Sequence, residues 1–321
     1  MKRNTFCLRF PAVVALGLLT VFPIAAAAQQ KPAPEGTPVR ITVTAASRAK
    51  GQEPPPLSKA DFLIYQDHNR RPVLDAVRQS GENNKLDLYI LIDDSTATDV
   101  TLDYSEIKSF VRELPSPARV GVVYALNGTV RVAQDLTSDR EAALKTLRIP
   151  IGRTGAGGGV YLSLADMAKR LTASPDRRRA ILLLSSGIDL YRGIEDSYPG
   201  LNTDLDSAIR QLTRGGITVY PIYISPAAHF LRNLFLINNG QSCLSRLADE
   251  TGGEAYFQGL ETPVDMKPFL DEMARHLDNQ YLVTFAAKPR AKSGYANIRV
   301  TTEVSGVDLA GPDLVYVPVE K

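Results

Sequence analysis

The distribution of apolar residues divides the chain into three parts. The middle part alternates between strand-like and helix-like patterns, whereas the two ends have only a strand-like pattern. In the middle, nearly continuous apolar runs such as 86–92 and 180–184 predict strands that are buried on both faces, as in a parallel sheet. Between such runs, apolar residues recur at helical spacing, as at Val160, Leu164 and Met167. This alternation over residues 86–278 predicts a doubly wound, mostly parallel α/β sheet. The other expected strands are 120–126, 128–134, 218–224 and 254–257, of which the first two are expected to be buried. The other expected helices are 104–114, 142–147, 205–212, 244–248 and 262–277. A capping box of Ser138 and Glu141 precedes the helix at 142–147.

At both ends of the chain the apolar residues alternate with polar ones, which is typical of half-buried strands. The pattern begins at Val39, Ile41 and Val43, and it returns after Gln280 without any helical spacing. Each end is too short to enclose a core of its own. We therefore infer that segments 38–85 and 279–321 pair into one small β-domain, with the α/β domain of residues 86–278 inserted between them.

The first 28 residues have the pattern of a secretory signal peptide. Lys2, Arg3 and Arg9 precede an apolar run from residue 12 to residue 28, which ends in small residues before Gln29. Residues 29–37 are polar and proline-rich, as in a leader or linker. We expect an exported protein, in the periplasm or released, that has no membrane span after signal cleavage because no second apolar run is long enough.

Composition and charge exclude several classes of protein. The chain has 321 residues, of which 44% are hydrophobic, so it has the apolar content of a folded protein. Loss of the signal peptide removes three cations and no acid, which shifts the formal net charge from +2 to −1 and disfavours nucleic-acid binding. It also leaves Cys243 as the single cysteine, so an internal disulfide is excluded.

Three loops after buried strands are the expected ligand site, because open α/β sheets bind ligands beyond the carboxyl ends of their strands. They are residues 93–98, 152–160 and 185–189. Here the chain resembles the von Willebrand factor A domain, and its flanks resemble the exported bacterial group called VWFA-related. The resemblance is carried by LYILIDDSTATD at 88–99, GAGGGVYLSLADMAKRL at 155–171, RAILLLSSGID at 179–189 and SRLADETGGEAYF at 245–257, with PLSKADFLIYQDHNRRPVLDAVRQ at 56–79 and NQYLVTF at 279–285 in the flanks.

The resemblance implies a metal-ion-dependent adhesion site, whose pattern is Asp-x-Ser-x-Ser, a Thr and an Asp on these three loops. Such a site holds Mg²⁺, which takes about six oxygen ligands. Asp93 and Ser95 match the pattern, but the remaining positions fall on Ala97, Val160 and Ser186. The resemblance therefore implies a degenerate site without a cofactor. The alternative is a variant Mg²⁺ site that begins one residue later, at Asp94, Thr96 and Thr98, with Asp189 as a further carboxylate.

Motifs for other chemistry are incomplete. The glycine-rich loop lacks the Lys of a P-loop, and Val160 stands where a dinucleotide fingerprint needs Gly or Ala. No G-x-S-x-G elbow or H-E-x-x-H motif occurs, and His68, His229 and His276 each stand alone in the sequence. We read Cys243 as a small buried side chain at a helix entry and Arg177–Arg179 as a solvated strand start. The expectation is a protein that is not an enzyme, with a hydrolase as the least favoured alternative.

One apolar segment is longer than its connection requires. Residues 226–239 lie between a strand and a helix, and they include Phe230, Leu234, Phe235 and Ile237 as candidates for contacts with a protein partner. Alternatively, the segment covers the sheet edge or the β-domain. The leading hypothesis is an exported protein-protein interaction module of the von Willebrand A type. Metal-dependent adhesion is the second hypothesis.

Overall fold

The structure is a computed structural model that describes residues 36–49, 51–97, 104–151, 158–171, 176–227, 230 and 233–319. The predicted signal peptide, most of the predicted leader, Thr98, His229 and residues 152–157 of the glycine-rich loop lie outside the described residues. The described part of the chain from residue 36 onward belongs to one compact unit. None of its helices combines the length and the apolarity that crossing a bilayer requires.

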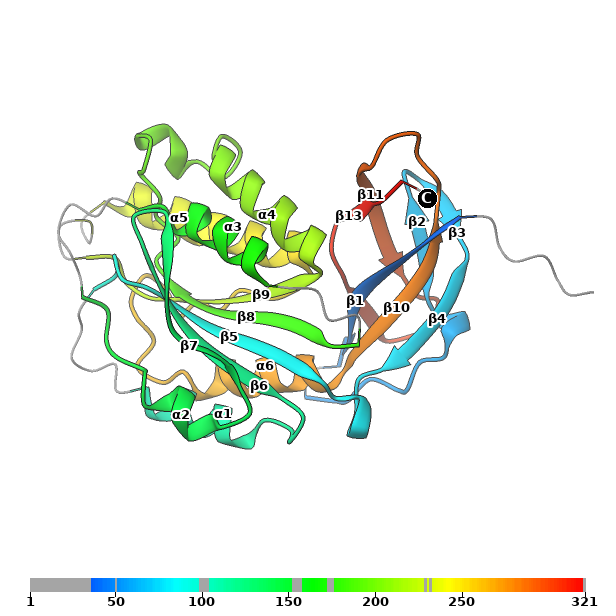
Figure 1. The fold of residues 1–321 in the computed structure, drawn as a ribbon, viewed down its shortest axis with the longest axis horizontal. Helices are drawn as coiled ribbons and strands as arrows, with labels where there is room; N and C mark the ends of the chain where they lie inside the picture. Colours follow the sequence, from blue (N-terminus) through cyan, green and yellow to red (C-terminus); the bar gives the residue numbers. More distant parts are fainter. Residues whose placement is uncertain are drawn as a thin grey trace, which may run out of the picture. The chain divides into compact units, whose positions relative to one another are not determined.

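The α/β domain is built on a five-stranded sheet in the order β7-β6-β5-β8-β9 (Figure 1). Neighbouring strands are parallel except β6 and β7, which are joined by a hairpin at Asn127–Gly128. Counted from the first strand of the domain, this is the 3-2-1-4-5 order of doubly wound folds. The predicted fold class is confirmed. The strands are β5 (Leu86–Asp93), β6 (Arg119–Leu126), β7 (Thr129–Thr137), β8 (Arg178–Ser185) and β9 (Ile217–Tyr223).

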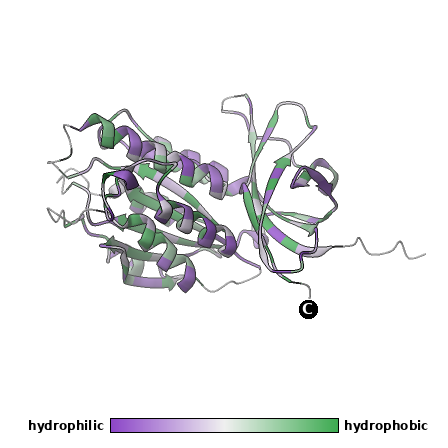
Figure 2. Ribbon diagram, turned by 90° about the horizontal axis from the view of Figure 1, so that it is seen from above, coloured by the Kyte–Doolittle hydropathy of each residue, from purple (hydrophilic) through white to green (hydrophobic). Residues whose placement is uncertain are grey.

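Helices cover both faces of this sheet, because each buries one apolar side (Figure 1). Helices α1, α2 and α6 share one core cluster with one face, and α3, α4 and α5 share another cluster with the opposite face. Figure 2 shows that these helices carry hydrophobic and hydrophilic positions together, as helices at a solvent boundary do. The helices are α1 (Ser105–Glu113), α2 (Arg140–Leu144), α3 (Val160–Arg170), α4 (Thr203–Gly215), α5 (Leu234–Thr251) and α6 (Lys267–Asp278), with a 3₁₀ turn η3 at Ile194–Ser197.

Strands from both ends of the chain form the two antiparallel sheets of the β-domain. One sheet has the order β12-β1-β10-β4 and the other β13-β11-β2-β3, and they enclose a third core cluster. The register pairs Val39 with Phe285 and Val43 with Tyr281, so apolar residues of both ends point into the same core. The strands are β1 (Thr37–Ser47), β2 (Leu63–Gln66), β3 (Asn69–Arg71), β4 (Val73–Arg78), β10 (Gln280–Ala287), β11 (Gly294–Thr301), β12 (Val307–Ala310) and β13 (Leu314–Val317), with 3₁₀ turns η1 (Lys59–Asp61) and η2 (Gly81–Asn83).

Several local predictions were wrong. Strand β7 is an exposed edge strand and not a buried one. Helix α2 is capped by Asp139, whose carboxylate accepts from Ala142 N at 3.0 Å, and not by Ser138. Residues 254–257 contribute a single bridge, between Tyr256 and Ile222, and no strand. Helix α6 begins at Lys267, later than expected, and β12 was not predicted.

The start of α5 corrects the interpretation of the apolar segment. Asn233 caps this helix through Leu236 N, and the helix runs without a break from Leu234 to Thr251. Residues 234–239 are therefore its first turns and not part of a loop insertion. Cys243 lies in the middle of the helix, not at its entry, and is 1% exposed.

The arginine run at the start of β8 is not a solvated strand start, because Arg178 is buried and Arg177 and Arg179 are half-buried. Arg178 is 2% exposed, and its guanidinium donates to the Leu277 carbonyl, to Gln280 Oε1 at 2.7 Å and to Asn84 Oδ1. The Leu277 carbonyl belongs to the last turn of α6, so the cation lies at the negative end of that helix. Arg178 thereby joins β8 to the end of α6 and to the first residue of β10.

Candidate functional site

The loops that follow β5 and β8 meet at the carboxyl edge of the central sheet, because these strands are parallel neighbours. Asp93 ends β5 and is 3% exposed. Its Oδ1 accepts from the Ser95 backbone N at 3.0 Å and from Ser95 Oγ at 2.6 Å, and its Oδ2 accepts from Ser185 Oγ at 2.7 Å. Burial raises the pKa of Asp93, while the hydroxyl donors oppose the shift. Both carboxylate oxygens therefore have donors from the chain itself.

The neighbouring Asp94 has a cation of its own. Its side chain is 4% exposed, and its two oxygens accept from both terminal nitrogens of Arg148, each at 2.7 Å. The Arg148 guanidinium also lies 3.7 Å from the ring centroid of Tyr124. This bidentate pair neutralises the carboxylate on which the variant Mg²⁺ site depends.

Asp189, which follows β8, differs from the other two carboxylates. Its Oδ1 accepts from Gly159 N at 2.9 Å and from Tyr191 N at 3.0 Å, which joins the second and third loops. Its Oδ2 has no hydrogen-bond partner among the described residues, although the side chain is buried. Burial raises the pKa of Asp189 to about 6.

The remaining positions of the adhesion-site pattern provide few side-chain oxygen atoms that could ligate a metal ion. Val160 is 2% exposed in the first turn of α3, and Ser186 is buried and accepts from Ile188 N at 3.4 Å. The small hollow beside Ser95 and Ser186 is lined otherwise by Gly158, Ile188, Leu190, Pro226 and Phe230. The Asp189 Oδ2 atom is the one orphaned carboxylate oxygen among the described loop residues. These residues do not fit the six-oxygen shell that Mg²⁺ requires.

An exposed apolar patch lies next to this edge, on the segment between β8 and α4 and on the first turn of α5. The rings of Tyr198 and Phe235 meet edge to face at 5.1 Å, and Asn239 Nδ2 donates to Ser197 Oγ at 3.3 Å. Large apolar side chains of both segments are thus exposed side by side. We use the name apolar patch for the exposed large apolar side chains of these two segments: Tyr191, Ile194, Tyr198, Leu201, Leu234 and Phe235, which are 41–61% exposed.

The four candidates for partner contacts are therefore placed differently. Leu234 and Phe235 belong to the apolar patch. Ile237 is 2% exposed in the core, where it cannot contact a partner. Phe230 packs against the same core cluster and lines the hollow beside Ser95.

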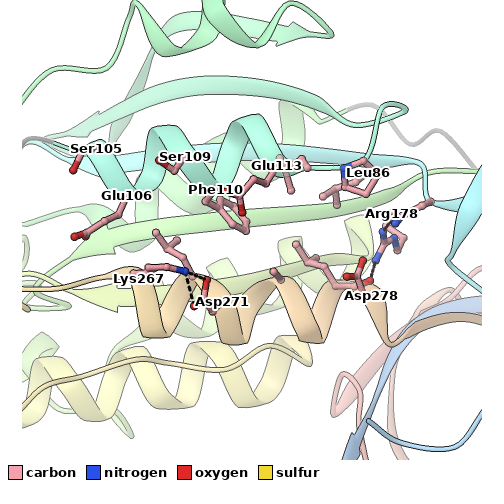
Figure 3. A pocket seen from close by; sticks show the side chains of 16 residues that line it. Leu86, Ser105, Glu106, Ser109, Phe110, Glu113, Arg178, Lys267, Asp271 and Asp278 are labelled. Atoms are coloured by element: carbon pink, nitrogen blue, oxygen red, sulfur yellow. Dashed lines mark hydrogen bonds and ion pairs between the residues drawn. The ribbon is translucent and has the colours of Figure 1, made fainter. Parts of the chain in front are cut away.

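A larger hollow of about 340 Å³ lies between α1 and α6, away from the three loops (Figure 3). Its floor includes Leu86, Phe110 and Leu270. The Lys267 Nζ atom is 2.8 Å from both carboxylate oxygens of Asp271 at the rim. An apolar floor with a polar rim can hold an apolar group of a ligand or partner.

Two features were missed in the sequence because residues that are distant in the chain create them. His276 does not stand alone: its Nε2 lies 3.3 Å from Glu254 Oε2, and Glu272 completes a cluster of three. The i, i+4 spacing of Glu272 and His276 was the available signal. The second feature is the Asp94–Arg148 pair, which joins residues 54 positions apart. Cys243 is unsuited to thiol chemistry, because burial raises its pKa to about 12.

No family model and no curated protein matches the chain. Among solved structures, it is similar to the conserved hypothetical protein BatB of Bacteroides thetaiotaomicron, with 12% identity, 60% of this chain and 98% of that chain covered, and a TM-score of 0.43. It is also similar to the SpRpn10 VWA domain, with 14% identity, coverage of 60% and 97%, and a TM-score of 0.38. A third similar structure is the manganese-loaded TRAP protein of Plasmodium vivax, with 10% identity, coverage of 79% and 98%, and a TM-score of 0.39.

Proposed function

We propose that the protein is an exported, non-enzymatic interaction module of the von Willebrand A type that binds a protein partner through its apolar patch. The strand order and the two helical layers of the α/β domain support this type of fold. The observation that carries the proposal is the exposure of Tyr198, Leu234 and Phe235 beside the carboxyl edge of the sheet. Exposed apolar clusters of this kind are typical of protein interaction sites, in which aromatic side chains contribute much of the binding energy. Export rests on the signal-peptide pattern of residues 1–28.

The proposed binding does not depend on a metal ion at the carboxyl edge. Asp93 is occupied by Ser95 and Ser185, and Asp94 is occupied by Arg148. A cation that used the two carboxylates would compete with these donors for the carboxylate oxygens.

The experiment compares capture of envelope proteins by the immobilised chain and by a triple variant, Tyr198→Ser with Leu234→Ser and Phe235→Ser. Val264→Ser is the matched control, because Val264 is 97% exposed outside the patch. We expect the affinity of the triple variant for the partner to be at least about tenfold lower than that of the wild type, since each buried aromatic anchor contributes on the order of 2 kcal/mol. We expect capture by the wild type to be the same with and without EDTA. Equal capture by the triple variant and the wild type would contradict the proposal.

Metal-dependent adhesion is the second candidate function, and the orphaned Oδ2 of Asp189 favours it. In that case, EDTA would abolish capture. Calorimetric titration with Mg²⁺ would show binding that Asp189→Asn removes. The absence of Mg²⁺ binding at millimolar concentration would exclude this candidate. Hydrolase chemistry is a remote third alternative, because Cys243 is buried and the described histidines lie outside the three loops.

A further inference from the structure

The cluster of Glu254, Glu272 and His276 combines three metal-ligating side chains from two parts of the chain. The carboxylate and imidazole atoms that each residue offers all lie within 4.8 Å of one another. Glu272 and His276 lie one turn apart on α6, and Glu254 follows the Gly252–Gly253 end of α5. We propose that this cluster binds one divalent transition-metal ion of the Zn²⁺ type.

The ligand set selects this class of ion. Imidazole nitrogen suits Zn²⁺ and related borderline ions, whereas Mg²⁺ and Ca²⁺ take oxygen ligands. A site with two carboxylates and one imidazole leaves a fourth tetrahedral position for water or for another ligand. The ligand atoms already lie within 4.8 Å of one another, so small side-chain rotations are enough to bring them around one ion.

The charges of the cluster suit a cation. Glu254 and Glu272 place two carboxylates beside one imidazole, and His276 Nε2 lies 3.3 Å from Glu254 Oε2. A divalent cation between the two carboxylates would remove the repulsion between their like charges.

A buried hydroxyl beside the cluster provides an independent observation. Tyr256 is 4% exposed, and its hydroxyl has no hydrogen-bond partner among the described residues. Its ring stacks on Phe269 at 5.5 Å, and Phe269 lies on the same side of α6 as Glu272 and His276. Tyr256 also follows Glu254 by two residues in the chain. Water or hydroxide in the fourth position of the ion would give the orphaned hydroxyl a partner.

This site is distinct from the three loops. His276 is in the last turn of α6, next to Leu277, whose carbonyl accepts from Arg178 at the first residue of β8. The cluster therefore lies toward the amino ends of the parallel strands, opposite the edge that carries Asp93 and Asp189. An ion there would fix the segment after α5 to the end of α6, which continues into β10 of the β-domain.

The test is calorimetric titration of the purified, metal-free chain with ZnCl₂, with MgCl₂ as the hard-ion comparison. We expect one Zn²⁺ per chain and no heat from Mg²⁺ at this cluster. Glu254→Gln, Glu272→Gln and His276→Gln should each weaken Zn²⁺ binding by at least about tenfold, because each removes a direct ligand. Glu303→Gln, an exposed carboxyl between β11 and β12, is the matched control and should bind as the wild type does.

Glu254→Gln keeps the test informative if the other variants fold poorly, since the Glu254 side chain is 46% exposed. Zn²⁺ should also raise the thermal unfolding temperature of the wild type but not that of this variant. Zn²⁺ binding that is insensitive to all three substitutions, or that is lost in Asp189→Asn, would overturn the proposal. So would the absence of binding at millimolar Zn²⁺.

Discussion

Asp189 shows how one buried residue can make the stability of this protein depend on pH. Burial raises its pKa from 3.8 to about 6, so the folded chain holds a proton on this carboxyl more tightly than the unfolded chain does. Its contribution to stability is full below pH 3.8 and is lost as the pH rises through 6. We expect the free energy of unfolding of the wild type to fall by about 3 kcal/mol relative to Asp189→Asn over this range.

Urea unfolding of both chains in a series from pH 4 to pH 7.5 measures that difference, with Glu303→Gln as a control that should run parallel to the wild type. A constant difference between the wild type and Asp189→Asn would contradict the prediction. A difference of the opposite sign would mean that the Asp189 carboxylate is stabilised in its charged form, as it would be beside a bound cation.

Single residues also show the limit of what the sequence can predict. Asp93 and Ser95 could be placed on one loop because two positions separate them, and the structure joins them by two hydrogen bonds. The partner of Asp94 could not be identified, because Arg148 comes from the segment after α2 and is one of many arginines. Local spacing therefore predicts contacts within a loop, whereas the charge balance of a site depends on tertiary contacts.

At the scale of elements, central strands were predictable and boundaries were not. Strand β5 lies between two parallel neighbours and buries nearly every side chain, which produces the continuous apolar run. Edge strand β7 has only one neighbour, so its apolar residues gave no guide to its exposure. The first turn of α5 was read as a loop because its exposed residues Leu234 and Phe235 break the expected amphipathic pattern.

Arg178 is the residue through which β8, α6 and β10 depend on one another. Arg178→Ala would leave three buried acceptors without this donor: the Leu277 carbonyl, Gln280 Oε1 and Asn84 Oδ1. It would also remove a cation from the end of α6. We expect a loss of about 3–5 kcal/mol in the free energy of unfolding. Arg178→Met should lose less, because it fills the same volume without a buried charge.

Urea unfolding of the two Arg178 variants measures this effect. The control is Arg170→Ala, which removes an exposed i, i+4 ion pair and should change stability by less than about 0.5 kcal/mol. If Arg178→Ala were as stable as the control, the three elements would not be coupled through this side chain.

At the scale of the whole molecule, the sequence predicted that the two ends of the chain share one β-domain, because neither end has enough apolar residues for its own core. The strand pairing itself was beyond prediction. Strand β1 lies between β10 and β12, and the short strand β12 carries too few residues to give a pattern. Hydrogen bonds are among the contacts with the α/β domain: Gln280 donates to Tyr220 Oη at 2.9 Å, and Tyr295 Oη donates to the Arg210 carbonyl at 3.0 Å.

Deletion of residues 36–49 tests this arrangement of the β-domain. Without β1, strand β10 loses its backbone partner from Thr37 to Thr44, and the core loses Ile41 and Val43. We expect the amides of β10 and β12 to exchange with solvent at least about tenfold faster, while the amides of β5 keep their protection. Hydrogen–deuterium exchange with mass spectrometry measures both regions in the same sample, with a chain beginning at residue 34 as the control. Unchanged protection in β10 would mean that this strand is held by the α/β domain and not by the amino-terminal end of the chain.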